Sequence, residues 1–114
     1  MLRLTSAADF ERVRRDGRSH AHPLVVLIAC RRPESLALPT RCGFMAGKRV
    51  GTAVARNRAK RRLREAVRAR WPDVEPGWDL IWIARQPVVV AAWPEVQQAI
   101  EQLLRRARVM KTNG

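Results

Sequence analysis

The sequence predicts a single α+β domain, a two-layer sandwich in which helices pack on a small mixed sheet. Two apolar runs, residues 24–30 and 78–84, have the length and the branched or aromatic content of buried strands. Apolar residues recur at helical spacing near the start, in the middle and near the end of the chain. With 114 residues, 46% of them apolar, residues 1–114 can bury one modest core and therefore form one domain.

The first helix is expected to begin at Thr5 or Ser6, either of which can cap it, and to end at Gly17. Phe10 and Val13 lie on its apolar side. Phe10 is either an anchor of the core or a ring at the edge of a cleft on which a base stacks, and the sequence leaves both open.

Strands are expected next. Residues 24–30 form a buried strand, and residues 31–40, which contain two prolines, form a polar connection at the surface. Residues 41–46 form a second strand, antiparallel to the first, and a short strand edge is expected around residues 49–50. Residues 78–84 are apolar on both faces apart from Asp79, as in an inner strand.

The C-terminal part ends in a helix. Residues 88–92 fit a short helix or an extended segment equally well. Pro94 suits the first turn of a helix that continues to about Arg108. The cations at its end, Arg105, Arg106 and Arg108, are favoured there by the helix dipole whether or not RNA is bound. Residues 109–114 are expected to fray.

The most unusual stretch is Lys48 to Arg70, which holds ten of the 23 Lys and Arg residues and one of the ten acids. The whole chain has a formal net charge of +13. Such a cluster repels itself and destabilises the folded chain unless a polyanion neutralises it. The stretch therefore predicts a surface that binds a polyanion.

This stretch also has helical geometry from Ala55 onward, between a start at Thr52 and a stop at Trp71-Pro72. One face of the expected helix is apolar and consists of Ala55, Ala59, Leu63, Ala66 and Val67. The opposite face carries Asn57, Lys60, Arg61, Arg64 and Arg68. One side is thus expected to pack on the core while the other projects guanidinium groups.

The chain lacks an obvious catalytic set. Its ten acids are scattered, and no pair resembles a two-metal site. His20 and His22 have no third ligand nearby, so no metal site is expected. Cys30 and Cys42 suit small buried thiols in a reducing, cytoplasmic setting. The sequence therefore predicts a binding protein without catalytic residues of its own.

The nature of the polyanion follows from the frame around the basic helix. A DNA-reading helix is usually backed by a helix-turn-helix, whereas this one lies in an α/β frame. A membrane-surface helix would carry Trp or Leu opposite its arginines, whereas this one carries mostly Ala. No apolar run approaches the length of a membrane span. RNA is favoured over DNA, and both are favoured over lipid.

The basic stretch resembles the signature of the bacterial ribonuclease P protein family. The family hallmark is an Arg-Asn-Arg triplet after a Lys-x-x-Gly-x-Ala-Val turn, followed by Lys-Arg and Arg-Glu, and residues 48–65 follow it closely. The likeness extends to Asp9-Phe10-x-x-Val13, Gly17 and Ile83-Ala84-Arg85. It implies an α-β-β-β-α-β-α fold with a four-stranded sheet and a left-handed crossover through the basic helix.

The resemblance also implies a function. In this family the protein is the small subunit of the ribonucleoprotein that removes the 5′ leader from precursor tRNA. The RNA subunit is the catalyst, and Mg²⁺ is bound mainly by that RNA and by substrate phosphates. The expected partners are therefore the catalytic RNA and precursor tRNA, with no DNA and no membrane. The alternative is a ribosomal or other structural RNA-binding protein with no processing role.

Site residues are carried over from the resemblance by position. Phe10, Val13 and Arg85 match residues that line the cleft for the single-stranded leader. Arg14 stands where the family commonly has a second aromatic, so charge and guanidinium stacking would serve the leader there. The positions that match the family's RNA-binding surface are Lys48, Arg49, Arg56, Asn57, Arg58, Lys60, Arg61, Arg64 and Arg68.

Overall fold

The structure is a computed structural model that describes residues 1–32 and 38–111. Its helices are α1 (Ala7–Asp16), α2 (Ala53–Arg70) and α3 (Trp93–Arg106). Its strands are β1 (Leu2–Arg3), β2 (Arg18–Ala21), β3 (Val25–Arg31), β4 (Arg41–Met45) and β5 (Trp78–Ala84). Short 3₁₀ helices are η1 (Lys48–Val50), η2 (Trp71–Asp73) and η3 (Gln86–Val89). The α+β class is confirmed.

The five strands form one mixed sheet in the order β1-β4-β5-β3-β2. β5 lies at its centre, antiparallel to β3 and parallel to β4. This confirms that the apolar 78–84 run is an inner strand. The strands at 24–30 and 41–46 do run in opposite directions, but β5 separates them, so they are not paired with each other.

The sheet has five strands where four were predicted. β1 pairs in parallel with β4, and β2 pairs with β3. β2, β3 and β4 are the three consecutive strands of the expected α-β-β-β-α-β-α order, so only β1 is additional to that order. β1 and β2 are short edge strands, LR and RSHA, which lack the apolar alternation by which a strand is recognised. The strand edge expected around residues 49–50 was wrong, because that segment is the 3₁₀ helix η1.

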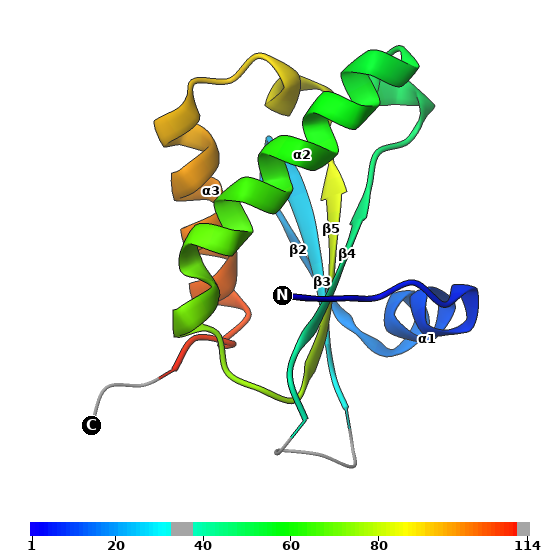
Figure 1. The fold of residues 1–114 in the computed structure, drawn as a ribbon, viewed down its shortest axis with the longest axis vertical. Coiled ribbons are helices and arrows are strands. Elements are labelled where there is room, and N and C mark those ends of the chain that lie inside the picture. Colours follow the sequence, from blue (N-terminus) through cyan, green and yellow to red (C-terminus); the bar gives the residue numbers. More distant parts are fainter. Residues whose placement is uncertain (33–37, 112–114) are drawn as a thin grey trace.

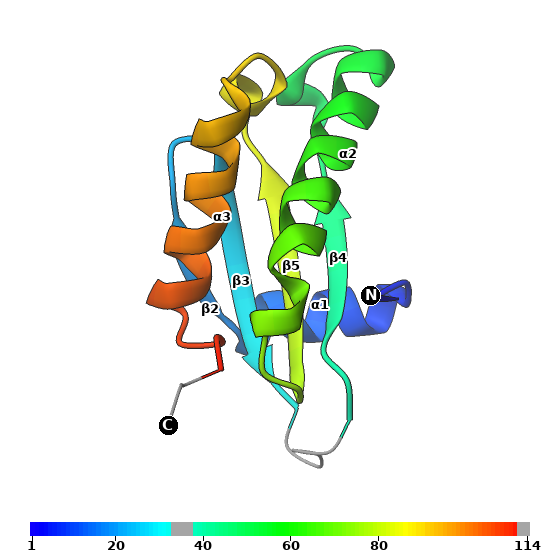
Figure 2. The ribbon, with the colours of Figure 1, turned by 60° about the vertical axis from the view of Figure 1, so that its left-hand side comes forward.

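Helices cover both faces of the sheet, as Figures 1 and 2 show. α2 and α3 lie side by side on one face, over the larger core that includes Leu63, Trp82 and Ile100. α1 covers only part of the opposite face, over a smaller core that includes Val13 and Ile81. Among the described helices, none covers the rest of that second face.

The connection from β4 through α2 to β5 is left-handed, as the resemblance implied. In Figure 2 the two parallel strands point up, α2 lies in front of the sheet, and the chain passes from β4 to β5 on its left. Right-handed crossovers are almost universal for such units, so base rates alone would have predicted the other hand.

α1 begins and ends at the predicted residues. The Ser6 side chain accepts a hydrogen bond from the Asp9 backbone N–H, which caps the helix. Gly17 ends it with an extended φ of −80°, so a left-handed conformation is not its purpose. A Cβ on Gly17 would lie 2.5 Å from the Val13 carbonyl oxygen and 2.8 Å from Ile28, which explains the glycine as a close approach of chain segments.

The expectation about the C-terminal tail was wrong, whereas the 31–40 connection is exposed as expected at Arg31, Leu38 and Pro39 and is buried only at Thr40 among its described residues. The C-terminal tail does not fray from residue 109, because Val109 is fully buried and accepts a hydrogen bond from the Glu75 N–H at 2.7 Å. Lys111 donates to the Asp73 carbonyl at the same distance. In the 31–40 connection, Thr40 is buried and its hydroxyl donates to the Glu75 carbonyl. Residues 33–37 and 112–114 lie outside the described residues.

Candidate nucleic-acid interface

α2 carries the predicted basic surface. The Thr52 side chain accepts a hydrogen bond from the Ala55 N–H at 3.2 Å and caps the helix. Its inner face is fully buried and consists of Ala59, Leu63, Ala66 and Val67. Three of these are small or β-branched, so the helix lies close to the sheet and turns its long side chains outward. The predicted division of α2 into an apolar and a cationic face is confirmed.

The cationic face of α2 is available to a ligand. Asn57, Arg61 and Arg68 are exposed, and Lys60 and Arg64 are partly exposed. Over residues 1–32 and 38–111, none of the nine predicted RNA-binding residues forms an ion pair. Arg70, which is outside that set, does pair with Glu101 at 2.8 Å. The charge of this face is therefore not neutralised by the carboxylates of the described part of the chain.

Two arginines on α2 donate hydrogen bonds to backbone carbonyls of the protein. Arg62 donates to the backbone carbonyls of Val88, Val89 and Ala91 at 3.2, 2.9 and 2.6 Å. Arg58 donates through Nε to the Val89 carbonyl at 3.1 Å, and the rest of its guanidinium faces outward. These bonds hold η3 against α2. Of the segment 88–92, which fitted a helix or an extended chain, residues 88 and 89 therefore belong to the 3₁₀ helix Gln86–Val89.

The Arg64 side chain extends from α2 toward the sheet edge formed by β1 and β4. Its guanidinium is over the Phe44 ring, 5.7 Å from Cζ to the centroid. Burial, and then the neighbouring charges of Arg3, Arg68 and Arg61, lower the pKa of Arg64. Arg3 thus adds a cation to this surface. Sequence reasoning missed Arg3 because only the parallel pairing of β1 with β4 brings it there.

The open part of the opposite sheet face forms a groove beside α1. Val26, Met45 and Ile83 are half-buried on its floor, at neighbouring positions of three strands. Phe10 lies against this floor, and a Cβ on Gly43 would come within 2.4 Å of its ring. Because Gly43 has no side chain, the Phe10 ring can pack directly on the sheet at this position. We call this surface, from Phe10 to Arg85, the sheet groove.

The structure places the predicted cleft residues in three different environments. Phe10 and Arg14 both line an open pocket of about 690 Å³ that also includes Met45. Arg85 lines a second pocket, of about 590 Å³, at the other end of the groove. Val13 was expected in the cleft wall, but it is fully buried in the core under α1 and has no surface to offer a ligand. That assignment is therefore wrong.

The groove and the basic helix meet at η1. Lys48 and Arg49 are exposed and line the same pocket as Arg85, and η1 leads directly into the start of α2. A ligand that leaves the groove at this end therefore passes cationic side chains on its way to α2. The two surfaces predicted separately from the sequence are continuous.

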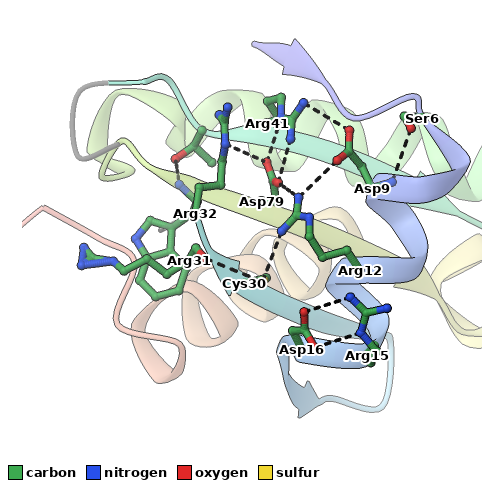
Figure 3. Close-up of polar contacts among 12 residues, drawn as sticks. Ser6, Asp9, Arg12, Arg15, Asp16, Cys30, Arg31, Arg32, Arg41 and Asp79 are labelled. Atoms are coloured by element: carbon green, nitrogen blue, oxygen red, sulfur yellow. Dashed lines mark hydrogen bonds and ion pairs between the residues drawn. The ribbon is translucent and has the colours of Figure 1, made fainter. Parts of the chain in front are cut away.

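Two carboxylates on the α1 side of the sheet, Asp79 and Asp9, are engaged in ion pairs, whereas Glu11 lines the pocket beside Phe10 and forms no ion pair with a described residue. Asp79 has no exposed surface and accepts hydrogen bonds from Arg12 and from Arg41, the latter at 2.8 and 2.9 Å (Figure 3). Asp9 pairs with the same two arginines at 3.4 Å. Burial by itself raises the pKa of Asp79, but the arginine hydrogen bonds outweigh it and the pKa lies below its usual value.

The buried carboxylate of this cluster is not suited to act as a general base. A general base needs a pKa near the working pH, whereas Asp79 is held as a carboxylate by its arginines. In the described part of the chain, no three His, Cys, Asp or Glu side chains gather where they could hold a metal ion. What the site can do is bind an extended anion along a groove and a helix.

Comparisons with known proteins agree with this arrangement. The Ribonuclease P family model matches residues 1–108. The ribonuclease P protein component of Herpetosiphon aurantiacus is 46% identical over 107 residues, covering 94% of this chain and 85% of that protein. That of Symbiobacterium thermophilum is 44% identical over 112 residues, covering 98% and 96%.

Solved structures show the same likeness. The Staphylococcus aureus RNase P protein superimposes with a TM-score of 0.84 at 32% identity, covering 97% of this chain and 99% of that one. Among the described helices, none has the length and apolar character to cross a membrane.

Proposed function

Because the chain belongs to the bacterial ribonuclease P protein family, as a protein component of that ribonucleoprotein enzyme, we propose that it binds the RNA subunit through α2 and the 5′ leader of precursor tRNA in the sheet groove. Together these contacts promote removal of the leader. The observation that carries the proposal is the cationic face of α2, which pairs with no carboxylate of the described residues and continues through η1 into the groove.

The α2 surface suits a folded RNA. Its guanidinium groups project from one rigid helix, and each can pair with a phosphate through two parallel hydrogen bonds. The Nε atoms of Arg56 and Arg64 are covered by protein but have no hydrogen-bond partner in the described part of the chain. The proposed contacts are Lys48, Arg49, Arg56, Asn57, Arg58, Lys60, Arg61, Arg64 and Arg68.

The sheet groove suits a single strand. A duplex presents its bases inward, whereas a leader exposes bases that can stack on the half-buried ring of Phe10. The apolar floor of Val26, Met45 and Ile83 accepts base or ribose surfaces. Arg14 at one end of the groove and Arg85 at the other supply charge for the phosphates.

Bond cleavage is left to the RNA subunit in this proposal. The chain's own described residues offer Mg²⁺ no cage of ligands, so we expect the ions to be bound by the RNA and by substrate phosphates. The two free cysteines are buried, which fits the reducing cytoplasm where we expect the protein to work. The RNA-free chain, incubated with precursor tRNA and Mg²⁺, should not release a leader, and leader release would contradict this division of labour.

The α2 assignment is tested by Arg61→Ala, with Arg105→Ala as the matched control. Arg61 is exposed on the cationic face, whereas Arg105 is exposed on α3 and pairs with Glu101. Arg61→Ala should weaken binding to the RNA subunit and lower the log–log salt slope by about 0.7–0.9 for each phosphate that the variant no longer neutralises. Arg105→Ala should change neither. Equal effects of the two variants would contradict the assignment.

The groove assignment is tested by Arg85→Ala, because Arg85 is exposed and its removal should not disturb the core. We expect the reconstituted enzyme to lose affinity for precursor tRNA while its affinity for mature tRNA, which has no leader, stays unchanged. Phe10→Leu, which keeps an apolar group on Gly43, should show the same selectivity through loss of stacking. Equal losses for both RNAs would show that the groove does not bind the leader.

A further inference from the structure

A second group of arginines lies away from the α2 face, at the far end of β3. β2 pairs with β3 only as far as Ala29, so among the described strands none pairs with Cys30 and Arg31 on that edge. The C-terminal ends of α1 and α3 flank this edge and enclose a pocket of about 700 Å³, which we call the sheet-edge pocket. Its cationic lining consists of Arg12, Arg18, Arg31, Arg106 and Arg108.

Most of this charge is not neutralised by carboxylates of the described residues. Arg12 is held by Asp79, and the acid in the pocket lining, Asp16, pairs with Arg15 at 3.1 Å. Within residues 1–32 and 38–111, no carboxylate forms an ion pair with the other four arginines. Arg106 donates one bond to the Ala21 carbonyl at 2.8 Å. The pocket therefore concentrates positive charge.

The backbone at Arg108 gives a second, independent observation. The Arg108 and Val109 N–H groups donate to the carbonyls of Arg105 and Leu104, which closes α3 in a Schellman turn. The turn needs a left-handed residue, usually glycine, and here Arg108 has φ 58°. A long cation occupies this position although glycine would be less strained. A strained residue at a pocket indicates a function for its side chain.

Arg31 provides a surface for stacking. Its guanidinium lies over the Trp78 ring, 5.1 Å from Cζ to the centroid. Figure 3 shows Arg31 pointing away from the Asp79 cluster, so it is not one of the arginines that hold that carboxylate. The ring covers one face of the guanidinium plane, and the Arg31 side chain remains exposed. Such a plane is a stacking surface for an unpaired base.

We propose that the sheet-edge pocket is a second RNA site, which binds a single-stranded segment with its phosphates on Arg18, Arg106 and Arg108 and a base stacked on Arg31. Planar guanidinium groups bind phosphate oxygens in pairs, and stacking tolerates any base. The pocket lies at the opposite end of β3 from the Lys48–Arg85 end of the groove. The inference does not depend on the proposed roles of α2 and the groove.

The two histidines of the chain allow a site-resolved test. His20 lines the pocket, whereas the His22 ring is held outside it and accepts a hydrogen bond from the Leu24 N–H at 3.1 Å. Burial, and then the charges of Arg106 and Arg18, lower the pKa of His20. Titration with a short oligouridylate, followed by proton NMR, should shift the His20 ring signal saturably and raise its pKa. A larger shift of His22 than of His20 would overturn the proposal.

Variants complete the test. Arg108→Gly removes a cation and relieves the backbone, so it should not lower the melting temperature. Combined with Arg31→Ala, it should weaken the oligouridylate affinity reported by His20 roughly tenfold. Arg105→Ala removes the same charge one turn earlier, outside the pocket, and should have an effect of about twofold or less. An unchanged affinity in the double variant, or an equal loss in Arg105→Ala, would overturn the proposal.

Two further arms separate this site from the others and identify its RNA. Arg61→Ala should leave the His20 shift intact, since α2 is not part of the pocket, and loss of the shift in this variant would overturn the proposal. Unlabelled RNA subunit and precursor tRNA are then added as competitors of a fluorescent oligouridylate bound to the Arg61→Ala, Arg85→Ala protein. The RNA that displaces the oligouridylate, and whose displacement of it changes when Arg108→Gly is added, is the source of the segment. Displacement by neither would overturn a role for the pocket in RNA binding.

Discussion

At the centre of the sheet, the carboxylate of Asp79 has no exposed surface and holds arginines from two other elements. Arg41 comes from β4 and Arg12 from α1, so this one residue ties α1 to the sheet. Asp79→Asn leaves the shape and removes the charge. We expect it to lower the free energy of unfolding by about 3 kcal/mol, the lower part of the range for a broken buried pair, because the arginines stay partly exposed. Urea unfolding at neutral pH measures this.

The same pair makes a prediction about pH. The pKa of Asp79 is lowered in the folded protein from an ordinary value of 3.8. The stabilisation is therefore complete above pH 3.8 and is lost as the pH falls below it toward the folded-state pKa. The stability difference between the native protein and Asp79→Asn should shrink in that acid range. A difference that stays constant from neutral to acid pH would show that the charge contributes nothing.

Gly43 and Gly47 form a matched pair of glycines on and beyond β4. A Cβ at Gly43 would lie 2.4 Å from the Phe10 ring, whereas a Cβ at Gly47 has nothing within 4 Å. Gly43→Ala should push Phe10 and α1 off the sheet and cost about 1–3 kcal/mol of unfolding free energy. Gly47→Ala, at φ −79°, should be neutral or slightly stabilising. Thermal unfolding of both variants checks this, and equal melting temperatures would contradict the packing of Phe10 on Gly43.

At the scale of elements, two arginines of α2 that are adjacent in the sequence differ in what they contact. Arg62 donates three bonds to the carbonyls of the η3 segment, whereas Arg61 points away from the protein. Arg62→Ala should lower the unfolding free energy by about 2 kcal/mol, since hydrogen bonds from charged groups are strong. It should change RNA affinity much less than Arg61→Ala does.

Arg61→Ala should show the reverse pattern, with stability within about 0.5 kcal/mol of the native protein. Comparing chemical denaturation with RNA-binding isotherms for the two variants separates structural from binding roles. If Arg62→Ala weakens RNA binding as strongly as Arg61→Ala while remaining stable, then the contacts with η3 do not keep Arg62 from the RNA.

Elements with a local signal were predicted well. The Thr52 cap, the alanine-rich inner face of α2 and the apolar β5 follow from neighbouring residues alone. Elements that depend on distant partners were not. β1 and β2 are polar in sequence and become strands only because β4 and β3 offer free edges. The buried tail at Val109 likewise depends on its backbone bond with Glu75.

The candidate site likewise contains residues that the local sequence indicates and residues that only the fold brings together. The cationic face of α2 repeats every turn and is visible in the sequence. The Asp79 cluster joins residues 9, 12, 41 and 79 of three elements, and no spacing rule connects them. Val13 matched the family's cleft by position, yet the spacing cannot tell which side of α1 faces the core and which the groove. In the sequence Arg62 resembles the neighbouring arginines, because its hydrogen bonds to the η3 segment form only in the folded chain.

The molecule as a whole carries a net charge of +13 on 114 residues. Much of this charge is unpaired in the described structure, so the folded protein repels itself when no RNA is bound. Raising NaCl from a few millimolar to physiological strength shortens the Debye length to about 8 Å and should raise the melting temperature of the RNA-free protein. The same change should weaken RNA binding. A melting temperature that falls or stays level over this range would show that the charges are already compensated.

The central position of β5 has a consequence for how the chain is made. Neither β3 nor β4 has its main partner until residues 78–84 have left the ribosome, although both were synthesised earlier. Among the described strands, two pairs can form before then, the β2–β3 hairpin and the short β1–β4 pair, and nothing joins the two pairs. The nascent protein must therefore hold two apolar strands and a strongly basic helix unassembled while ribosomal RNA lies close by. A chain that terminates before residue 78 should yield no stable sheet at all.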